Sequence, residues 1–337
     1  MDLSIGTPVD PVPEPVRAAL ADAADAPGYP ATQGTQRVRE VAAGWLARRH
    51  SVSADPSAVL PLIGSKEFIA ALPTMLGCGP GDTVVHPELA YPTYAIGAQL
   101  AGATAMAADG LAALGPVRVT LVWVNSPANP TGRVLPAAHL RKMVDWARER
   151  GAVIAADECY LDLGWDAEPV SVLHPSVCGG SFDGLLAVHS LSKRSNMAGY
   201  RAGFVTGDPA LVAQLLEIRR HAGMMMPAPI QAAMAAALDD DAHAEDQRAR
   251  YAARRERLRA ALAAAGWVTE HSEAGLYLWV ARPGLDCWGS VQLLAEAGIL
   301  VAPGEFYGPA GREHVRVALT ATDERIDAAV ARLAAIA

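Results

Sequence analysis

The middle of the chain alternates short apolar runs with longer segments in which apolar residues recur every three or four positions. The apolar runs are rich in β-branched residues and cover residues 83–86, 119–124, 153–156, 185–189 and 202–206. Between two of them, residues 136–150 place Leu140, Met143, Val144 and Ala147 on one helical face and charged residues on the other. Buried strands that alternate with amphipathic helices are typical of a parallel sheet covered by helices. We therefore predict an α/β fold.

The pattern changes after Pro227, where two alanine-rich helical segments run to Ala265. Further short apolar runs follow, with helical segments between and after them, at residues 267–269, 275–280, 299–301 and 314–318. The sequence contains no internal repeat, and no low-complexity linker separates this region from the first one. The sequence thus predicts a second, smaller α/β unit that packs closely against the larger one.

Composition narrows the class of protein. Of the 337 residues, 51% are hydrophobic and 19% are charged, which is typical of a folded chain with a large core. The net charge of −8 and the mixing of basic with acidic residues make nucleic acid an unexpected partner. Without a leader or a bilayer-length apolar run in the sequence, we expect a cytoplasmic protein with no membrane partner. The cysteines are widely spaced and predict free thiols, with no metal site: Cys78, Cys159, Cys178 and Cys287.

Lysine is scarce, so any lysine chemistry has few candidates. The chain has 25 arginines but only three lysines, Lys66, Lys142 and Lys193. Lys142 falls on the polar face of a predicted helix, and Lys66 follows Gly64 at a strand-to-helix turn. Lys193 follows an apolar run in the segment SLSK, and Arg201 comes eight residues later. A lysine at the end of a buried strand can lose hydration, which favours Schiff-base chemistry, and the nearby hydroxyl and guanidinium groups suit a phosphate. A surface turn with a chance arginine is the alternative.

Two more polar segments follow predicted strands. Residues 125–132, NSPANPTG, come after the 119–124 run, and residues 157–160, DECY, come after the 153–156 run. Ligands bind at the carboxyl ends of strands in open α/β sheets, and an Asn amide there can donate to a ring oxygen. Turn chemistry alone would also explain the Pro and Gly residues, and the two acids of DECY could simply be solvated.

Taken in order, NSPANPTG, DECY, SLSK with AGYRAGF, and VRVAL resemble the signature set of the class I and II aminotransferases of fold type I. The matching segments run from Ile5-Gly6 to Arg316 and so cover most of the chain. The resemblance implies pyridoxal 5'-phosphate as the cofactor and a three-layer fold with a mainly parallel sheet. It also implies an N-terminal segment (1–27) that joins the small domain, a large cofactor-binding domain (28–235) and a small C-terminal α/β domain (236–337).

The resemblance also implies roles for the residues around the cofactor ring. Lys193 would form the Schiff base and then carry the proton between two carbon atoms as base and acid. Asp157 would pair with the pyridinium nitrogen and keep it protonated. Asn129 and Tyr160 would hydrogen-bond the phenolic oxygen of the ring, and Tyr91 would stack on its face. An ordinary core aromatic is the alternative for Tyr91.

The resemblance also indicates which residues would bind the cofactor phosphate and the substrate carboxylate. The resemblance implies that the cofactor phosphate is held by two side chains and by backbone N–H groups at a helix start, namely Ser190 and Arg201 with Ser65 and Lys66. Arg316 would bind the substrate α-carboxylate as a bidentate fork, with help from Asn129 and from Gly6 of the N-terminal strand. Tyr29 matches a family tyrosine that reaches the phosphate of the neighbouring subunit, which implies a homodimer with shared active sites.

The substrate is less sharply indicated than the cofactor. Segments such as GTPVDPVPEPV, PGYPATQGTQRVRE and LPLIGSKEFIAALPTMLG most resemble the actinobacterial type of N-succinyldiaminopimelate aminotransferase, which implies lysine and diaminopimelate biosynthesis with glutamate and 2-oxoglutarate as the partner pair. The sequence opens almost at residues 3–6, whereas relatives usually carry a further N-terminal segment that helps to cover the site. A misplaced start, a trimmed sequence and a real loss are equal alternatives, so the question of substrate enclosure stays open. Candidates for the distal end of the substrate are Gln33 of the neighbouring subunit and Met224, Met225 and Met226, for which flexible core filler is an equal alternative.

Three classes of function remain at this stage. The first is transamination of N-succinyldiaminopimelate or of another amino acid. The second is β-elimination from cysteine conjugates on the same fold, which also needs Lys193. The third is a non-catalytic regulatory module, which predicts either a fused DNA-binding segment or a missing catalytic lysine. The sequence given has Lys193 and shows no helix-turn-helix pattern before Asp2.

Overall fold

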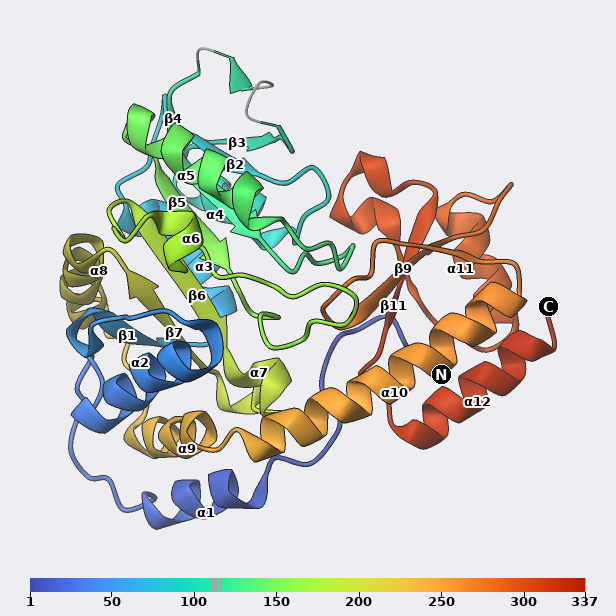
Figure 1. Ribbon diagram of the computed structural model, residues 1–337, viewed down its shortest axis with the longest axis horizontal. Helices are drawn as coiled ribbons and strands as arrows, with labels where there is room; N and C mark the ends of the chain where they lie inside the picture. Colours follow the sequence, from blue (N-terminus) through green and yellow to red (C-terminus); the bar gives the residue numbers. More distant parts are fainter. Residues whose placement is uncertain (111–113, 116, 337) are drawn as a thin grey trace.

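The computed structural model describes residues 1–110, 114–115 and 117–336, and its larger part is built on a seven-stranded sheet (Figure 1). In spatial order the strands are β1 (Val59–Ile63), β7 (Ala202–Gly207), β6 (Leu185–Ser190), β5 (Val153–Asp157), β4 (Val119–Asn125), β2 (Thr83–His86) and β3 (Thr104–Ala107). β7 runs antiparallel to its neighbours β1 and β6, and the other pairs are parallel. The predicted mainly parallel sheet is confirmed.

The sequence analysis predicts no strand at β3, and it indicates β1 only through the strand-to-helix turn at Gly64, without bounds. β1 is an edge strand that contains Pro61, and proline has no backbone N–H to donate to a ladder, so its segment does not read as a strand. β3 forms the opposite edge, is rich in alanine and has only half-buried or exposed side chains. β1 is apolar but is interrupted by Pro61, and β3 lacks the run of large apolar residues that marks the central strands.

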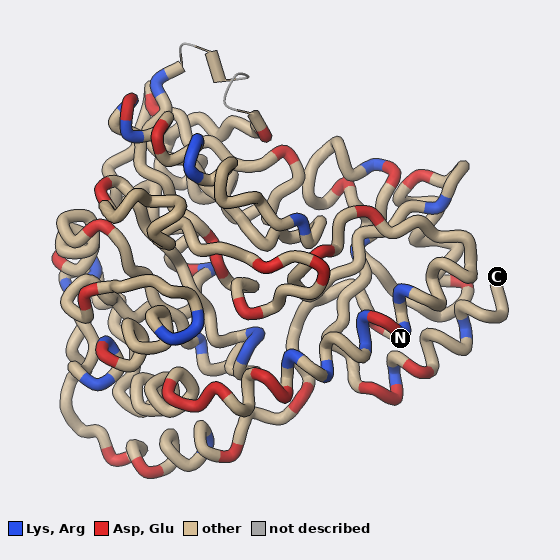
Figure 2. Tube along the Cα trace, viewed as in Figure 1, with Lys and Arg blue, Asp and Glu red and all other residues tan. Residues whose placement is uncertain are grey.

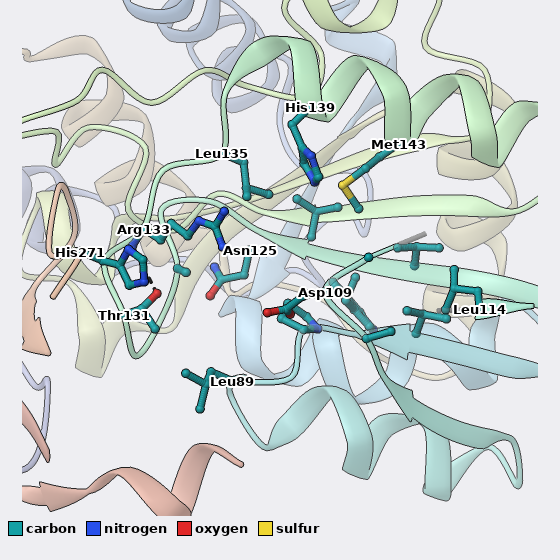
Figure 3. Close-up of a pocket in the computed structure, with 18 residues that line it drawn as sticks. Leu89, Asp109, Leu114, Asn125, Thr131, Arg133, Leu135, His139, Met143 and His271 are labelled. Carbon is teal, nitrogen blue, oxygen red and sulfur yellow. Dashed lines mark hydrogen bonds between the residues drawn. The ribbon is translucent and has the colours of Figure 1, made fainter. Parts of the chain in front are cut away.

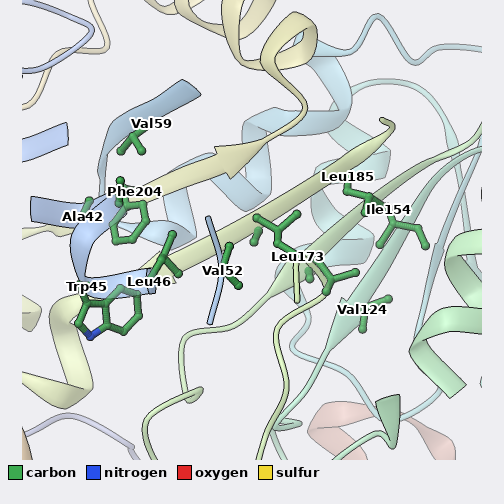
Figure 4. Close-up of a cluster of buried hydrophobic side chains, with 14 of the residues drawn as sticks. Ala42, Trp45, Leu46, Val52, Val59, Val124, Ile154, Leu173, Leu185 and Phe204 are labelled. Atoms are coloured by element: carbon green, nitrogen blue, oxygen red, sulfur yellow. The ribbon is translucent and has the colours of Figure 1, made fainter. Parts of the chain in front are cut away.

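Helices cover both faces of this sheet. One face packs against α2 (Gln36–His50), α5 (Ala137–Arg150), α6 (Pro175–Cys178) and α9 (Ala228–Asp239). The other packs against α3 (Ser65–Met75), α4 (Thr93–Leu100) and α8 (Pro209–His221). Along β6, Leu185 and Ala187 enter the first core, whereas Leu186 and Val188 enter the second. Burial on both faces explains why this strand is apolar without alternation. Figure 4 shows the first core, where Trp45 of α2 lies against Phe204 of β7.

The smaller unit contains a four-stranded antiparallel sheet in the order β10 (Ala302–Pro303), β11 (His314–Ala318), β9 (Tyr277–Ala281) and β8 (Val268–Glu270). The helices α10 (Ala242–Ala264), α11 (Cys287–Glu296) and α12 (Asp323–Ala334) complete it. The strand expected at residues 299–301 is wrong in position. Only Leu300 makes a bridge, to Asp2, and the strand itself begins at Ala302.

The first residues of the chain pair with this smaller sheet. The Leu3 amide donates to the Leu300 carbonyl and the Leu3 carbonyl accepts from the Ala318 amide, both at 2.8 Å. The next helix, α1 (Glu14–Asp22), packs instead against α9 of the larger unit. The domain limits at residues 27 and 235 stay a prediction. The pairing at Leu3 carries Gly6 to the side of β11, where the functional site lies.

Acidic and basic residues alternate along the chain trace (Figure 2). Arg254 of α10 pairs with Asp10 at 2.7 Å and with Asp323 of α12 at 2.9 Å, which ties three segments together. All four cysteines are free thiols, as expected. Among the helices of the described ranges, none combines the length and the apolar character that crossing a membrane requires.

Candidate active site

The carboxyl ends of β4, β5 and β6 lie side by side, and Asn125, Asp157 and Ser190 end these strands. A cavity of about 580 Å³ adjoins them and reaches across to the smaller unit. Apart from Tyr29, all the candidates for binding the cofactor and the substrate α-carboxylate line this cavity: Gly6, Ser65, Lys66, Tyr91, Asn129, Asp157, Tyr160, Ser190, Lys193, Arg201 and Arg316. Elements that are far apart in the sequence therefore form a single site.

Lys193 lies on a short helix, α7 (Leu191–Arg194), directly after β6. The Ser190 side chain caps this helix by accepting from the Ser192 amide at 3.2 Å. The Lys193 amine donates to the Gly6 carbonyl of the N-terminal segment. The strand and the cap fix the base of the side chain, so its amine stands inside the cavity.

Asp157 is 5% exposed and is held by two hydrogen bonds. Its Oδ2 accepts from the Tyr94 hydroxyl at 2.7 Å, and its Oδ1 accepts from the Cys159 amide at 3.2 Å. Burial raises the pKa of this carboxyl above its ordinary value. A cation against it would reverse that shift, so the carboxylate suits a protonated ring nitrogen. Tyr94 was missed from the sequence, although its place one helical turn after Tyr91 could have indicated it.

A second buried acid lies just behind Asp157. Glu158 accepts from the Ser171 hydroxyl at 3.1 Å and the Val172 amide at 2.7 Å, and its other oxygen lies 3.7 Å from Nε2 of His189. Burial raises the pKa of Glu158 to about 8 and lowers the pKa of His189 to about 3. The alternative of two solvated acids in DECY is therefore wrong, and Glu158 is a neutral carboxylic acid near pH 7.

The start of α3 forms an anion cradle. Gly64 precedes the helix with φ +75°, and a Cβ there would lie 2.1 Å from Nη2 of Arg201. Glycine provides no side-chain cap, so the first N–H groups of α3, including those of Ser65 and Lys66, are available to an anion. Arg201 donates from Nη1 to the Ala198 carbonyl at 2.9 Å, which fixes its guanidinium over this helix start. The cradle fits a phosphate group.

Arg316 of β11 faces the same cavity from the smaller unit. It is 7% exposed, and its Nη1 and Nη2 donate to Oδ1 of Asn129 at 2.9 Å and to the Ser4 carbonyl at 2.6 Å. Its buried Nε has no partner among the described residues. The rings of Tyr277 and Tyr307 lie 4.0 Å and 4.8 Å from the guanidinium carbon. A guanidinium held in this way can bind a planar carboxylate.

Tyr277 and Tyr307 were also missed, because nothing local marks either of them as a site residue. Tyr277 lines the cavity, and its hydroxyl lies 3.3 Å from the Tyr160 hydroxyl. The signal that could have found it is pairing: β9 and β11 are adjacent, and Tyr277 stands opposite Ala318, two residues from Arg316.

The remaining candidates lie elsewhere. The Tyr29 side chain is 97% exposed and belongs to no cavity described for this protomer. Met226 is buried in the core of the larger unit, and the Gln33 amide donates to the Ser57 carbonyl at 3.4 Å. Neither these two residues nor Met224 and Met225 line the 580 Å³ cavity. For the methionines, core or surface filler is the better interpretation within one protomer.

A smaller cavity of about 160 Å³ lies beside the site (Figure 3). It is formed between α5, which contributes His139 and Met143, and the ends of β2 and β4. Asn125, at the end of β4, and Thr131, from the loop that carries Asn129, border it. It contains no candidate residue from the sequence, so we place the chemistry in the larger cavity.

The family follows from a comparison that covers almost the whole chain. The model of the aminotransferase class I and II family matches residues 1–333, and this chain belongs to that family. It is an aminotransferase, and the class depends on pyridoxal phosphate. The amine of Lys193, the carboxylate of Asp157 and the anion cradle at Gly64 fit that cofactor.

Individual relatives agree with the class. The chain is 63% identical over 334 residues to a probable aminotransferase of Mycobacterium tuberculosis, covering 99% of this chain and 80% of the relative. It is 62% identical over 333 residues to OxyQ of Streptomyces rimosus, a 4-dedimethylamino-4-oxo-anhydrotetracycline transaminase, covering 99% and 92%. A solved probable N-succinyldiaminopimelate aminotransferase from Thermus thermophilus superimposes with a TM-score of 0.90 at 30% identity, covering 100% and 95%.

Proposed function

We propose that the residues of the large cavity perform transamination with distinct roles. Bound pyridoxal phosphate supplies a conjugated ring that takes up the electrons released at the substrate Cα. Lys193 holds the cofactor through its amine and moves the proton at that carbon. Asp157 holds the ring nitrogen in its protonated form, and Asn129 and Tyr160 donate to the ring oxygen. Tyr91 covers the ring face.

The other residues bind the anionic ends of cofactor and substrate. Arg201, Ser190 and the first N–H groups of α3 hold the phosphate. Arg316, with Asn129 and the backbone at Gly6, binds the substrate α-carboxylate. The observation that carries this proposal is the meeting of Lys193, Asp157 and Arg316, from three separate elements, in one cavity.

The active unit is a homodimer in this proposal. Its support is Tyr29, a large aromatic side chain that is 97% exposed in a single protomer. Its hydroxyl reaches the phosphate in the partner's site, so each site needs two subunits. The assembly acts in the cytoplasm, and a mass measurement in solution at working concentration tests for two subunits.

For the substrate, we propose an amino acid that carries a second, distal carboxylate, with N-succinyldiaminopimelate as the donor and 2-oxoglutarate as the acceptor. The relatives that support this include LL-diaminopimelate aminotransferases, such as that of Aquifex aeolicus at 33% identity over 355 residues, and the Thermus structure. The cavity supports it through Lys66, whose exposed ammonium lies 5.6 Å from the centroid of the Tyr91 ring. This ammonium is free to attract a distal carboxylate at the mouth of the cavity.

Replacement of Lys66 tests the substrate class. In Lys66→Met we expect KM for N-succinyldiaminopimelate and glutamate to rise about five- to tenfold, since one partly exposed ion pair is lost. KM for alanine, which has no distal carboxylate, should not change. Lys142→Met, which removes an exposed lysine of α5, is the matched control. An equal rise for all donors would contradict the role, because it would point to the shared α-carboxylate or the cofactor.

A second candidate function is amination of a large polycyclic ketone, which the 62% identity to OxyQ favours. A donor and acceptor panel separates the candidates. Rapid turnover of N-succinyldiaminopimelate with 2-oxoglutarate supports the first, and preference for a bulky ketone acceptor supports the second. Release of pyruvate, ammonia and thiol from cysteine conjugates would favour β-elimination instead.

A further inference from the structure

Tyr277 connects the two sides of the cavity. It lies in β9 and is 4% exposed. Its hydroxyl stands 3.3 Å from that of Tyr160, which follows β5 of the larger unit. The face of its ring lies 4.0 Å from the guanidinium carbon of Arg316. One side chain therefore contacts both the proposed donor to the cofactor ring oxygen and the proposed carboxylate-binding arginine.

The position of the Tyr277 hydroxyl is fixed by close packing. A Cβ added to Gly6 would lie 2.1 Å from this hydroxyl, so the hydroxyl fills the space that any larger residue at position 6 would need. The carbonyl of the same Gly6 accepts from the Lys193 amine. Gly6 is thus held between Tyr277 and Lys193, and the phenol has little room to turn away from Tyr160.

The surroundings of Tyr277 and Tyr160 shift the pKa values of their phenols in opposite directions. Burial opposes ionisation of Tyr277, but the positive charges of Arg316 and Lys193, together with the hydrogen bond shared with Tyr160, hold its pKa below the ordinary value. Burial raises the pKa of Tyr160 well above its ordinary value. Either hydroxyl can donate to the other, and a Tyr160 hydroxyl that donates to the cofactor ring accepts from Tyr277. Six titratable groups from five segments of the chain face Tyr277: Cys159, Tyr160, Lys193, Tyr251, Tyr307 and Arg316.

We propose that Tyr277 is a positioning residue of the active site, which donates a hydrogen bond to the Tyr160 hydroxyl and supports the Arg316 guanidinium with its ring. The hydrogen bond leaves the proton of Tyr160 directed at the cofactor oxygen and strengthens Tyr160 as a donor. The ring face keeps the guanidinium in the plane that a carboxylate needs. This inference rests on the proposed roles of Tyr160 and Arg316.

The first test uses the protein without cofactor, so its result does not depend on transaminase activity. Ultraviolet titration of tyrosinate should show one phenol in the wild type that ionises at lower pH than an exposed tyrosine such as Tyr29. Tyr277→Phe should lose this first step. Tyr307→Phe, which also keeps a ring beside Arg316, should retain it. Loss of the step in Tyr307→Phe, or its persistence in Tyr277→Phe, would overturn the electrostatic basis of the proposal.

The second test uses the cofactor-loaded protein without substrate. In Tyr277→Phe we expect the pKa of the visible cofactor absorption to rise by about 0.5 to 1 pH unit, the worth of one net hydrogen bond. Tyr307→Phe should leave that pKa at the wild-type value. An unchanged pKa in Tyr277→Phe, or equal shifts in both variants, would overturn the proposal.

Removal of the whole ring tests the second contact. Tyr277→Leu should raise KM about five- to tenfold for every amino donor, with a smaller change in kcat, because the support beneath Arg316 is lost. A rise confined to one donor would overturn the supporting role and assign Tyr277 to side-chain recognition. Absence of transaminase activity in the wild type would instead refute the proposed function and leave the cofactor-free titration as the test of Tyr277.

Discussion

The two sides of the cavity are built in different ways. On the side of the large sheet, strand ends position the central groups: Asp157 is the last residue of β5, and Lys193 lies on the short helix directly after β6. On the side of the smaller unit, Arg316 is held by the N-terminal segment at Ser4 and by Asn129 of the other unit. The cofactor side thus depends on local strand-to-turn geometry, whereas the substrate side depends on contacts between segments about 190 to 310 residues apart. Variants of the cofactor side should therefore lose the cofactor absorption, whereas variants of the substrate side should lose substrate binding.

Lys193→Ala should have the largest effect and should break the cofactor side alone. The variant loses the only lysine amine that follows β6, so we expect turnover to fall about 10⁴-fold or more, as removal of a general base and covalent anchor does. The visible absorption of the bound cofactor should disappear while the fold is kept. Absorption spectra and steady-state rates check both effects, and wild-type absorption with wild-type turnover would refute the assignment of Lys193.

Arg316→Lys should break the substrate side and leave the cofactor side intact. A point ammonium cannot reproduce the bidentate grip on a carboxylate, so we expect kcat/KM to fall about 10- to 100-fold for all amino donors. The visible cofactor spectrum should match the wild type. Kinetics with several donors provide the check. A loss confined to one donor would move Arg316 from the α-carboxylate to the substrate side chain.

Glu158→Gln tests a buried group of the cofactor side that does not line the large cavity. Glu158 lies next to Asp157 in the chain and packs behind it. Folding raises the pKa of Glu158 from 4.5 to about 8, so in that pH range the folded protein keeps a proton that the unfolded chain releases. The contribution of Glu158 to the free energy of unfolding is therefore largest below pH 4.5, and it decreases as the pH rises toward about 8.

The neutral amide of the Glu158→Gln variant removes this dependence. We expect the melting temperature of the variant to rise relative to the wild type as the pH increases through this window. Thermal melts across the window measure it, with Glu168→Gln as an exposed-acid control. Parallel curves for wild type and Glu158→Gln would mean that Glu158 is charged in the folded protein.

The same contrast explains how much the sequence could predict. The central strands and the residues after them were found because burial on both faces leaves apolar runs, and polar motifs interrupt these runs where strands end. Lys193, Asp157 and Asn129 belong to this group. The edge strand β1 was indicated only by the turn that follows it, because Pro61 interrupts the pattern, and β3 was missed because its side chains are only partly buried.

Among the residues that line the cavity from the smaller unit and the chain start, the sequence indicated only Arg316 and Gly6, and both through the resemblance to a family. Tyr277 and Tyr307 stayed hidden on this side, and Tyr94 on the cofactor side, because each is an ordinary aromatic in its own segment. Tyr277 becomes a site residue only when β9 pairs with β11 and the chain start returns to place Gly6 under its hydroxyl. Such contacts depend on tertiary folding, which a local pattern does not encode.

A single-turnover measurement tests most directly whether the two sides work together in transamination. The cofactor-loaded wild type is mixed with glutamate in the absence of any 2-oxo acid acceptor, and the cofactor spectrum and the products are followed. Our account predicts one 2-oxoglutarate per subunit, complete loss of the initial visible absorption, and its recovery when a 2-oxo acid is added. Release of ammonia with an unchanged cofactor, or no 2-oxoglutarate at all, would contradict it.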